Sequence, residues 1–140
     1  MRTIELNIGM DNNPYANIGG LYIFQRMLEA VTSSPRYTFE VEAYDMVTSE
    51  WQGKPELTFV VVLKTDMNES EFEGYLQSLC MTFGQDAIAG TLSGKGHLVY
   101  DGLYFGEKDE FDYTYFKTLQ KFGSSTMTGA IRNTGTKLNK

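Results

Sequence analysis

Cysteine, histidine and proline are scarce in this chain of 140 residues, which has one cysteine, one histidine and three prolines. A single cysteine, Cys80, excludes an internal disulfide, so a reducing cytoplasm is the expected location. With His97 as the only histidine, the chain also lacks the ligand set of an ordinary structural zinc cluster. We therefore predict no metal site and no cofactor.

Long apolar runs are also missing. No stretch of about 18 consecutive apolar residues is present, which excludes a transmembrane helix. Glu5, Asn7 and Asp11 interrupt the apolar positions near the N-terminus, so we expect no secretory signal peptide. Hydrophobic residues still make up 41% of the chain and aromatic residues 14%, which is enough for one globular core without membrane contact.

Basic residues are rare before position 117. Residues 1–116 hold all 18 acidic residues and seven basic ones, a net charge of −11, whereas residues 117–140 hold five basic residues and no acidic one. We predict a single α+β domain at 1–116. We expect residues 117–140 to form a basic Gly/Ser/Thr-rich tail that is either mobile or ordered by a partner or a neighbouring subunit. The acidic residues 1–116 should repel nucleic acid and attract basic surfaces. An alternative explanation of the acidic residues is that they keep a small protein soluble.

A strand, a helix and a second strand form the centre of the sequence. The first strand is an unbroken apolar run that includes three consecutive valines, which is typical of a strand inside a sheet. Asn68 is a good helix N-cap, and Glu71 stands three residues later, where a capping box places its acidic partner. The expected bounds are 57–63 for the first strand, 68–83 for the helix and 86–92 for the second strand.

The elements around this centre complete a known order. Alternating apolar and polar residues predict strands at 2–10 and from 37 to 43 or 47, and helical spacing predicts a helix at 21–31. Residues 48–55 are expected to form a loop, and residues 97–100 a short additional strand. The order β-α-β-β-α-β indicates a ferredoxin-like antiparallel sheet with both helices on one face, followed by the extra strand and the basic tail.

The segment at 101–116 combines aromatic rings with acidic groups, a composition found in protein-binding surfaces. An equal alternative is that these rings cover the open face of the sheet and complete the core. The residues predicted to bind a partner are Tyr104, Phe105, Asp109, Glu110, Phe111, Asp112 and Tyr113.

A second candidate site lies where the central helix meets the next strand. Polar residues at such a junction line a shallow pocket or serve the local turn. Basic residues of the tail are candidates for contacts with phosphate groups. The predicted ligand-binding residues are Asn12, Gln85, Asp86, Lys117, Lys121 and Arg132. Cys80 is expected to be a buried apolar residue and His97 a surface residue, and neither belongs to a recognisable catalytic arrangement.

Three short stretches resemble small accessory proteins encoded by bacteriophage genomes. They are RTIELNIGMDNN from Arg2 to Asn13, FGQDAIA at 83–89 and HLVY at 97–100. The resemblance covers roughly residues 1–115. It implies a cytoplasmic role in the infected host cell, with inhibition of a host defence system as one form of that role, and it supplies no catalytic residues.

These observations favour a non-enzymatic binding protein. The main prediction is a phage protein, self-associating as a homo-oligomer, that inhibits a host protein with a basic surface through its acidic aromatic segment. The alternative is a small-molecule binder that sequesters a signalling nucleotide, with tail residues contacting the phosphates. An enzyme using Asp86 or the acidic residues at 69–73 is less favoured, because no nucleophile or metal ligand set accompanies them.

Overall fold

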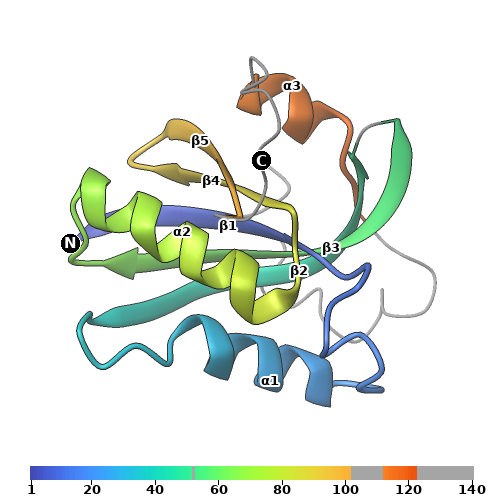
Figure 1. The fold of residues 1–140 in the computed structure, drawn as a ribbon, viewed down its shortest axis with the longest axis horizontal. Helices are drawn as coiled ribbons and strands as arrows, with labels where there is room; N and C mark the ends of the chain where they lie inside the picture. Colours follow the sequence, from blue (N-terminus) through green and yellow to red (C-terminus); the bar gives the residue numbers. More distant parts are fainter. Residues whose placement is uncertain (52, 102–111, 123–140) are drawn as a thin grey trace.

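The computed structural model describes residues 1–51, 53–101 and 112–122. These residues form one six-stranded antiparallel sheet with the strand order β5-β4-β1-β3-β2-β6 (Figure 1). The strands are β1 (Arg2–Gly9), β2 (Phe39–Trp51), β3 (Lys54–Thr65), β4 (Ala87–Leu92), β5 (Lys95–Tyr100) and β6 (Lys121–Phe122). The helices are α1 (Tyr22–Val31), α2 (Glu69–Phe83) and α3 (Tyr113–Thr118).

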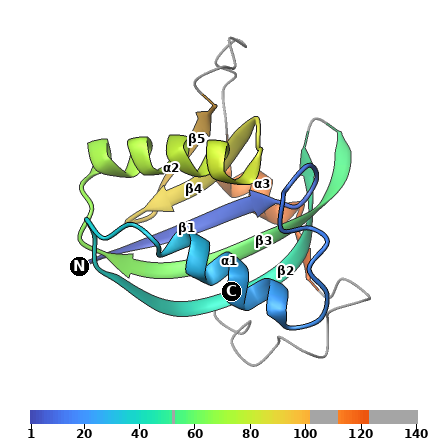
Figure 2. The same cartoon turned by 60° about the horizontal axis from the view of Figure 1, so that its bottom comes forward.

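Helices α1 and α2 lie side by side across one face of the sheet (Figures 1 and 2). The four central strands run in the order β4-β1-β3-β2, so the predicted ferredoxin-like α+β fold is confirmed. The valine-rich strand β3 lies between β1 and β2, in the interior of the sheet. The predicted strand at 97–100 is present as β5, which begins two residues earlier and pairs with β4.

The ends of α2 follow from the sequence. The Asn68 side chain accepts a hydrogen bond from the Glu71 backbone at 2.9 Å, and the Glu71 side chain accepts one from the Asn68 backbone at 3.0 Å. This is the predicted capping box, which satisfies two otherwise unpaired amides. The helix stops at Gly84, whose φ of 63° places it in the left-handed region that favours glycine.

The main core lies between the sheet and these two helices. Successive side chains of a strand point to opposite faces, and Ile4, Leu6 and Ile8 of β1 all point to the helices and are fully buried. Phe59, Val61 and Leu63 of β3 do the same. Val60, between them, is also buried and packs with Ala43 and Val47 on the other face, where Val62 is half-buried against the same residues. Cover on both faces explains why this strand lacks alternation.

The predicted loop at 48–55 is wrong. Strand β2 continues to Trp51, β3 begins at Lys54, and the two are joined by a tight hairpin in which Gly53 has a φ of 78°. Pairing continues through Glu50 opposite Pro55 to Trp51 opposite Lys54. Proline is tolerated there because β1 pairs with β3 only as far as Thr58, which leaves one side of Pro55 without a paired strand.

The C-terminal part of the described chain packs on the sheet. Helix α3 spans the predicted domain boundary at residue 116, and β6 pairs with Val47 and Thr48 of β2. Residues 123–140 of the predicted tail lie outside the described residues. Among the described residues, no helix is both long enough and apolar enough to cross a membrane.

Candidate functional site

The face of the sheet opposite α1 and α2 carries an unusual mixture of groups. Glu5 and Asn7 of β1 point to this face, because Ile4, Leu6 and Ile8 point the other way. Asn7 pairs with Val60 of β3 and Ala89 of β4, so its side chain lies over the middle of the sheet. Asn7 is only 4% exposed, and a polar side chain buried this deeply needs hydrogen-bond partners.

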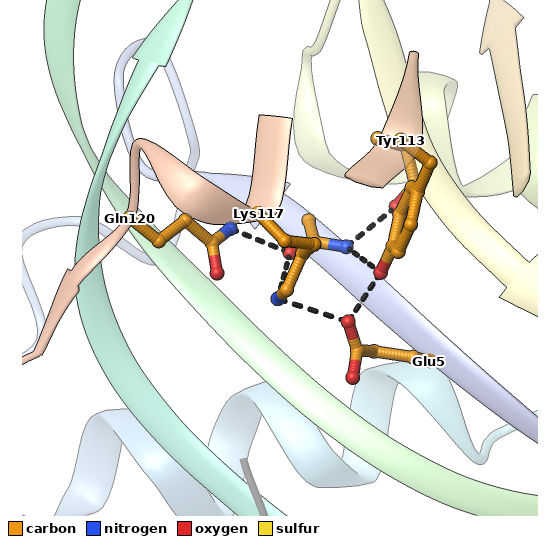
Figure 3. Close-up of polar contacts among 6 residues, drawn as sticks. Glu5, Tyr113, Lys117 and Gln120 are labelled. Atoms are coloured by element: carbon orange, nitrogen blue, oxygen red, sulfur yellow. Dashed lines mark hydrogen bonds and ion pairs between the residues drawn. The ribbon is translucent and has the colours of Figure 1, made fainter. Parts of the chain in front are cut away.

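Helix α3 and the residue two positions after it supply most of those partners (Figure 3). The Asn7 amide nitrogen donates to the Tyr113 hydroxyl oxygen at 2.9 Å and to the Ala89 carbonyl at 3.1 Å. Its amide oxygen accepts from Lys117 Nζ at 3.0 Å and from Gln120 Nε2 at 2.7 Å. Asn7 therefore joins β1, β4 and the C-terminal segment.

Glu5 extends this network. Its carboxylate accepts a hydrogen bond from the Tyr113 hydroxyl and pairs with Lys117 Nζ at 2.9 Å. Burial raises the pKa of Tyr113, and the negative charge of Glu5 raises it further. Burial lowers the pKa of Lys117, and the attraction of Glu5 works in the opposite direction. We call Glu5, Asn7, Tyr113, Lys117 and Gln120 the α3 network.

A cavity of about 210 Å³ opens beside the α3 network, where β1 ends and β4 begins. Asn7 forms part of its wall, as do the apolar side chains of Leu98 and Phe116. The remaining wall is mostly polar. It includes Gly9, Asp11, Asn12, Ser49, Lys54, Pro55, Glu56, Thr58, Gly84, Gln85, Asp86, Ala87 and Ala89.

Gly9 allows two polar side chains to meet at this wall. A Cβ atom at Gly9 would lie 2.6 Å from Gln85 Oε1 and even closer to the Glu56 carboxylate. Any other residue at position 9 would therefore push both groups away. Gln85 is itself anchored, because its amide nitrogen donates to the carbonyls of Asp11 at 2.8 Å and Phe83 at 2.9 Å.

The electrostatics of the cavity centre on Glu56. Partial burial raises the pKa of this carboxyl, and the nearby charges of Asp11 and Asp86 raise it further. A hydrogen bond from the Asp11 backbone opposes these effects. Three carboxyl groups therefore share one small cavity, and Lys54 also lines its wall.

Ser49 adds a further polar group to the cavity wall. The residue is 2% exposed, and its hydroxyl oxygen has no hydrogen-bond partner among the described residues. A buried hydroxyl without a partner costs free energy unless something else bonds to it. Together with the Glu56 carboxyl and Gln85 Oε1, it provides a cluster of hydrogen-bonding atoms at the wall of the cavity.

The structure brings part of the predicted ligand site together. Asn12, Gln85 and Asp86 all line the cavity. Lys117 lies in the α3 network instead, bonded to Glu5 and Asn7. The position of the Lys121 side chain and the whole of Arg132 lie outside the described residues.

The predicted partner-binding segment is described only at its end. Asp112 caps α3 by accepting a hydrogen bond from the Tyr115 backbone at 3.1 Å. Tyr113 points to the sheet and lies against Gly96, where a Cβ atom would come within 2.6 Å of the Tyr113 Cβ. This residue therefore covers the sheet face, as the alternative expectation proposed. Tyr104, Phe105, Asp109, Glu110 and Phe111 lie outside the described residues.

Sequence reasoning missed Asn7, Ser49 and Glu56. For Asn7 and Glu56 the only signal is a polar residue at every second position of a strand, which is also what a solvent-facing strand shows, and Ser49 lies in a polar run that looks like a loop. Three of the four hydrogen bonds made by the Asn7 side chain join residues more than 100 positions apart. No local pattern contains that information.

The two residues weighed for thiol chemistry are both buried. Cys80 is fully buried, as predicted, and burial raises the pKa of its thiol to about 12, which keeps it in the unreactive thiol form. The prediction of a surface histidine is wrong, because the His97 side chain is 8% exposed. It lies on β5 under α2, where the Phe72 ring contacts it edge-on at 5.4 Å between centroids.

Comparison with known proteins gives little at the level of sequence. No family model matches the chain, and a search of curated proteins found no match. Two solved structures are similar. A phage SAM lyase in complex with S-methyl-5'-thioadenosine is 13% identical with a TM-score of 0.41, and the match covers 74% of this chain and 92% of that one. The apo phage SAM lyase is 12% identical with a TM-score of 0.39, covering 74% and 91%.

Both neighbours are phage proteins, as are the proteins that the sequence resembles, at identities too low to assign a family or an activity. They are enzymes, and one holds a small molecule. The main prediction, inhibition of a host protein through the acidic aromatic segment, is wrong, because both similar structures are phage SAM lyases and Tyr113 of the proposed binding surface faces the sheet. The cytoplasmic location and the homo-oligomer stay predictions.

Proposed function

We propose that this protein binds a small molecule in the cavity beside the α3 network, and that the bound molecule presents a positive charge or hydrogen-bond donors to Glu56. The observation that carries the proposal is the Glu56 carboxyl, half-buried at the cavity wall beside Asp11 and Asp86. Small-molecule sites are usually preformed hollows with a few polar groups that converge on the ligand.

A carboxyl group in this position works against folding at neutral pH. Burial and like charges both disfavour its ionised form, so ionised Glu56 lowers the free energy of unfolding. A cationic ligand would offset that cost, since it replaces the lost water and neutralises the charge. A carboxyl group in a cavity whose pKa is raised by burial and by neighbouring charges is therefore a candidate for a functional role.

The charge of the cavity argues against recognition of a phosphate there. The predicted alternative was a nucleotide whose phosphates meet Lys117 and other tail residues. Lys117 Nζ already pairs with Glu5 and bonds to Asn7. A phosphate in the cavity would instead face Asp11, Glu56 and Asp86. The proposal therefore keeps the predicted small-molecule ligand, but the group that the protein recognises is a cation instead of a phosphate.

Three adenosine derivatives that differ in charge at the 5' position test this. They are S-adenosylmethionine, which carries a sulfonium cation, S-methyl-5'-thioadenosine, which is neutral there, and adenosine monophosphate, which is anionic. We expect calorimetry to rank their affinities in that order, with about a tenfold difference between the first and the last, or about 1.4 kcal/mol. Thermal melting should rank them in the same way, because a ligand of the folded state raises the melting temperature.

Two variants place the binding in the cavity. Glu56→Gln should weaken the sulfonium compound about tenfold and leave the neutral one nearly unchanged, since only the charge is removed. Gly9→Ala should weaken both, because its Cβ displaces Glu56 and Gln85. Glu40→Gln removes an exposed carboxylate of β2 and serves as the control. Tightest binding of the phosphate, no binding of any of the three, or no effect of Glu56→Gln would contradict the proposal.

A further inference from the structure

A second group of polar side chains lies on the opposite face of the sheet from the cavity. Glu69 and Glu73 stand one turn apart near the start of α2, and His97 of β5 lies beneath them. His97 Nδ1 is 3.4 Å from Glu73 Oε1, and His97 Nε2 is 3.8 Å from Glu69 Oε1. One atom from each of the three side chains falls within 4.8 Å of the others.

His97 is the unusual member of this group. Its side chain is 8% exposed, and its Nε2 atom has no hydrogen-bond partner among the described residues. A buried ring nitrogen without a partner costs free energy, so such atoms normally have one in a native protein. The edge of Phe72 holds the imidazole ring in place against the two carboxylates. An imidazole held in position beside two carboxylates is an arrangement that can bind a metal ion.

We propose that Glu69, Glu73 and His97 bind a divalent transition-metal ion such as Zn²⁺. Nitrogen and oxygen ligands lie about 2.0–2.2 Å from zinc, which puts neighbouring ligands of a tetrahedral site about 3.4 Å apart. One ligand atom from each of the three side chains lies within 4.8 Å of the other two, so a modest contraction of the cluster would reach that spacing. An imidazole ligand favours zinc and its transition-metal neighbours, whereas Mg²⁺ and Ca²⁺ favour oxygen ligands alone.

The surroundings allow a metal ion to enter. Lys95 Nζ is 2.6 Å from Glu69 Oε1, so this ammonium group occupies one carboxylate oxygen in the metal-free protein. The Lys95 side chain is 69% exposed and is free to move into water when a stronger cation arrives. A groove of about 590 Å³, lined by Glu69 and His97 among others, leaves room for water molecules to complete the coordination.

Titration of the untagged full-length chain with Zn²⁺ tests the site. Calorimetry should show saturable binding of one ion, with Mg²⁺ at least about tenfold weaker. The chain has one histidine, so its imidazole proton signals in an NMR spectrum are identified without mutagenesis. Those signals should shift in step with the calorimetric saturation. Zn²⁺ that binds without moving them, or fails to bind, overturns the proposal.

Matched variants separate a built site from general surface acidity. Glu73→Gln and His97→Gln should each weaken Zn²⁺ about tenfold or more, whereas Glu40→Gln, which removes an exposed carboxylate of β2, should change it less than about twofold. Circular dichroism confirms that each variant is folded. Equal weakening by Glu40→Gln, or none by Glu73→Gln, rejects the site.

The competing lysine gives a test in the opposite direction. Lys95→Gln should tighten Zn²⁺ about threefold to tenfold, because it removes the cation that pairs with Glu69. Lys64→Gln is the control, since it removes an equal charge that pairs with Glu42 on β2. Lys95→Gln that binds Zn²⁺ no more tightly than Lys64→Gln contradicts the role of Glu69. The Glu56→Gln variant should bind Zn²⁺ normally, so this proposal and the cavity proposal fail independently.

Discussion

The two faces of the sheet are built from the same strands and stabilised in different ways. On the face under α1 and α2, β1 contributes Ile4, Leu6 and Ile8 to a continuous apolar core. On the other face the same strand contributes Glu5 and Asn7, which are held by individual hydrogen bonds to α3 and Gln120. Apolar packing tolerates many arrangements that fill the space, whereas a buried polar group needs a specific partner. The arrangement of the polar face therefore depends on individual residues, whereas that of the apolar face depends mainly on how well the core is filled.

Two neighbouring valines of β3 test this difference directly. Val60 and Val61 are both fully buried but face opposite sides. We expect Val61→Ala to lower the free energy of unfolding by about 2–4 kcal/mol and Val60→Ala by about 1–2 kcal/mol, since a cavity in the larger core is filled less easily. Urea unfolding followed by circular dichroism measures both. Equal losses would show that the two faces contribute equally to stability.

The ion pair of the α3 network should give the next largest effect. Lys117→Met leaves Glu5 without its cation, and both side chains are only 21% exposed. We expect a loss of about 1–3 kcal/mol, less than the roughly 3–5 kcal/mol for a fully buried pair, because both side chains reach water. The double variant Glu5→Gln/Lys117→Met should recover part of that loss, because no unpaired charge remains. Strict additivity of the two single changes would show that the pair is not coupled.

The contact between α3 and β5 depends on the missing side chain at position 96. Gly96→Ala places a Cβ 2.6 Å from the Cβ of Tyr113, so we expect about 1–2 kcal/mol of destabilisation. Gly74→Ala in α2 is the matched control. Nothing lies within 4 Å of its Cβ, and alanine there should stabilise the helix by about 0.5–1 kcal/mol. Effects of the same sign for the two variants would contradict the close packing of Tyr113.

The smallest effect is the one that depends on pH. The pKa of Glu56 is higher in the folded protein than in the unfolded chain, where it is about 4.5. Between these two pKa values the folded protein binds more protons than the unfolded chain, so the free energy of unfolding falls as the pH rises from about 4.5 through the folded-state pKa. Glu56→Gln removes that loss. We expect no difference from the parent at pH 4 and a gain of less than about 1 kcal/mol at pH 8, because water screens the half-exposed group. Asp11→Asn should reduce the gain.

Much of the fold was predictable because its elements carry local signals. Three elements were identified from their own residues. The capping box of Asn68 and Glu71 marks the start of α2, alternation marks β1, and the unbroken apolar run marks β3. The extension of β2 and β3 to a short turn at Gly53 was not predicted, since the polar residues before it and Pro55 after it look like a loop. Pairing across strands overrides such local preferences.

The candidate site was only half predictable. Asn12, Gln85 and Asp86 lie at chain turns, where polar residues attract attention from the sequence alone. Glu56 and Asn7 lie within strands, and their importance comes from residues that reach them from distant parts of the chain. The cluster of Glu69, Glu73 and His97 was missed for the same reason, because a helix and a strand that are separate in the sequence bring its members together.

The attachment of α3 has a consequence for motion on slow timescales. This helix has six residues, none of them fully buried, and is joined to the sheet by a few polar contacts rather than by a large apolar area. Such a segment opens at a lower free energy than the sheet unfolds. Its amides should exchange with deuterium well before those of β1 and β3. Each opening would also lift Phe116 from the cavity wall and give an enclosed molecule a route out while the sheet stays intact.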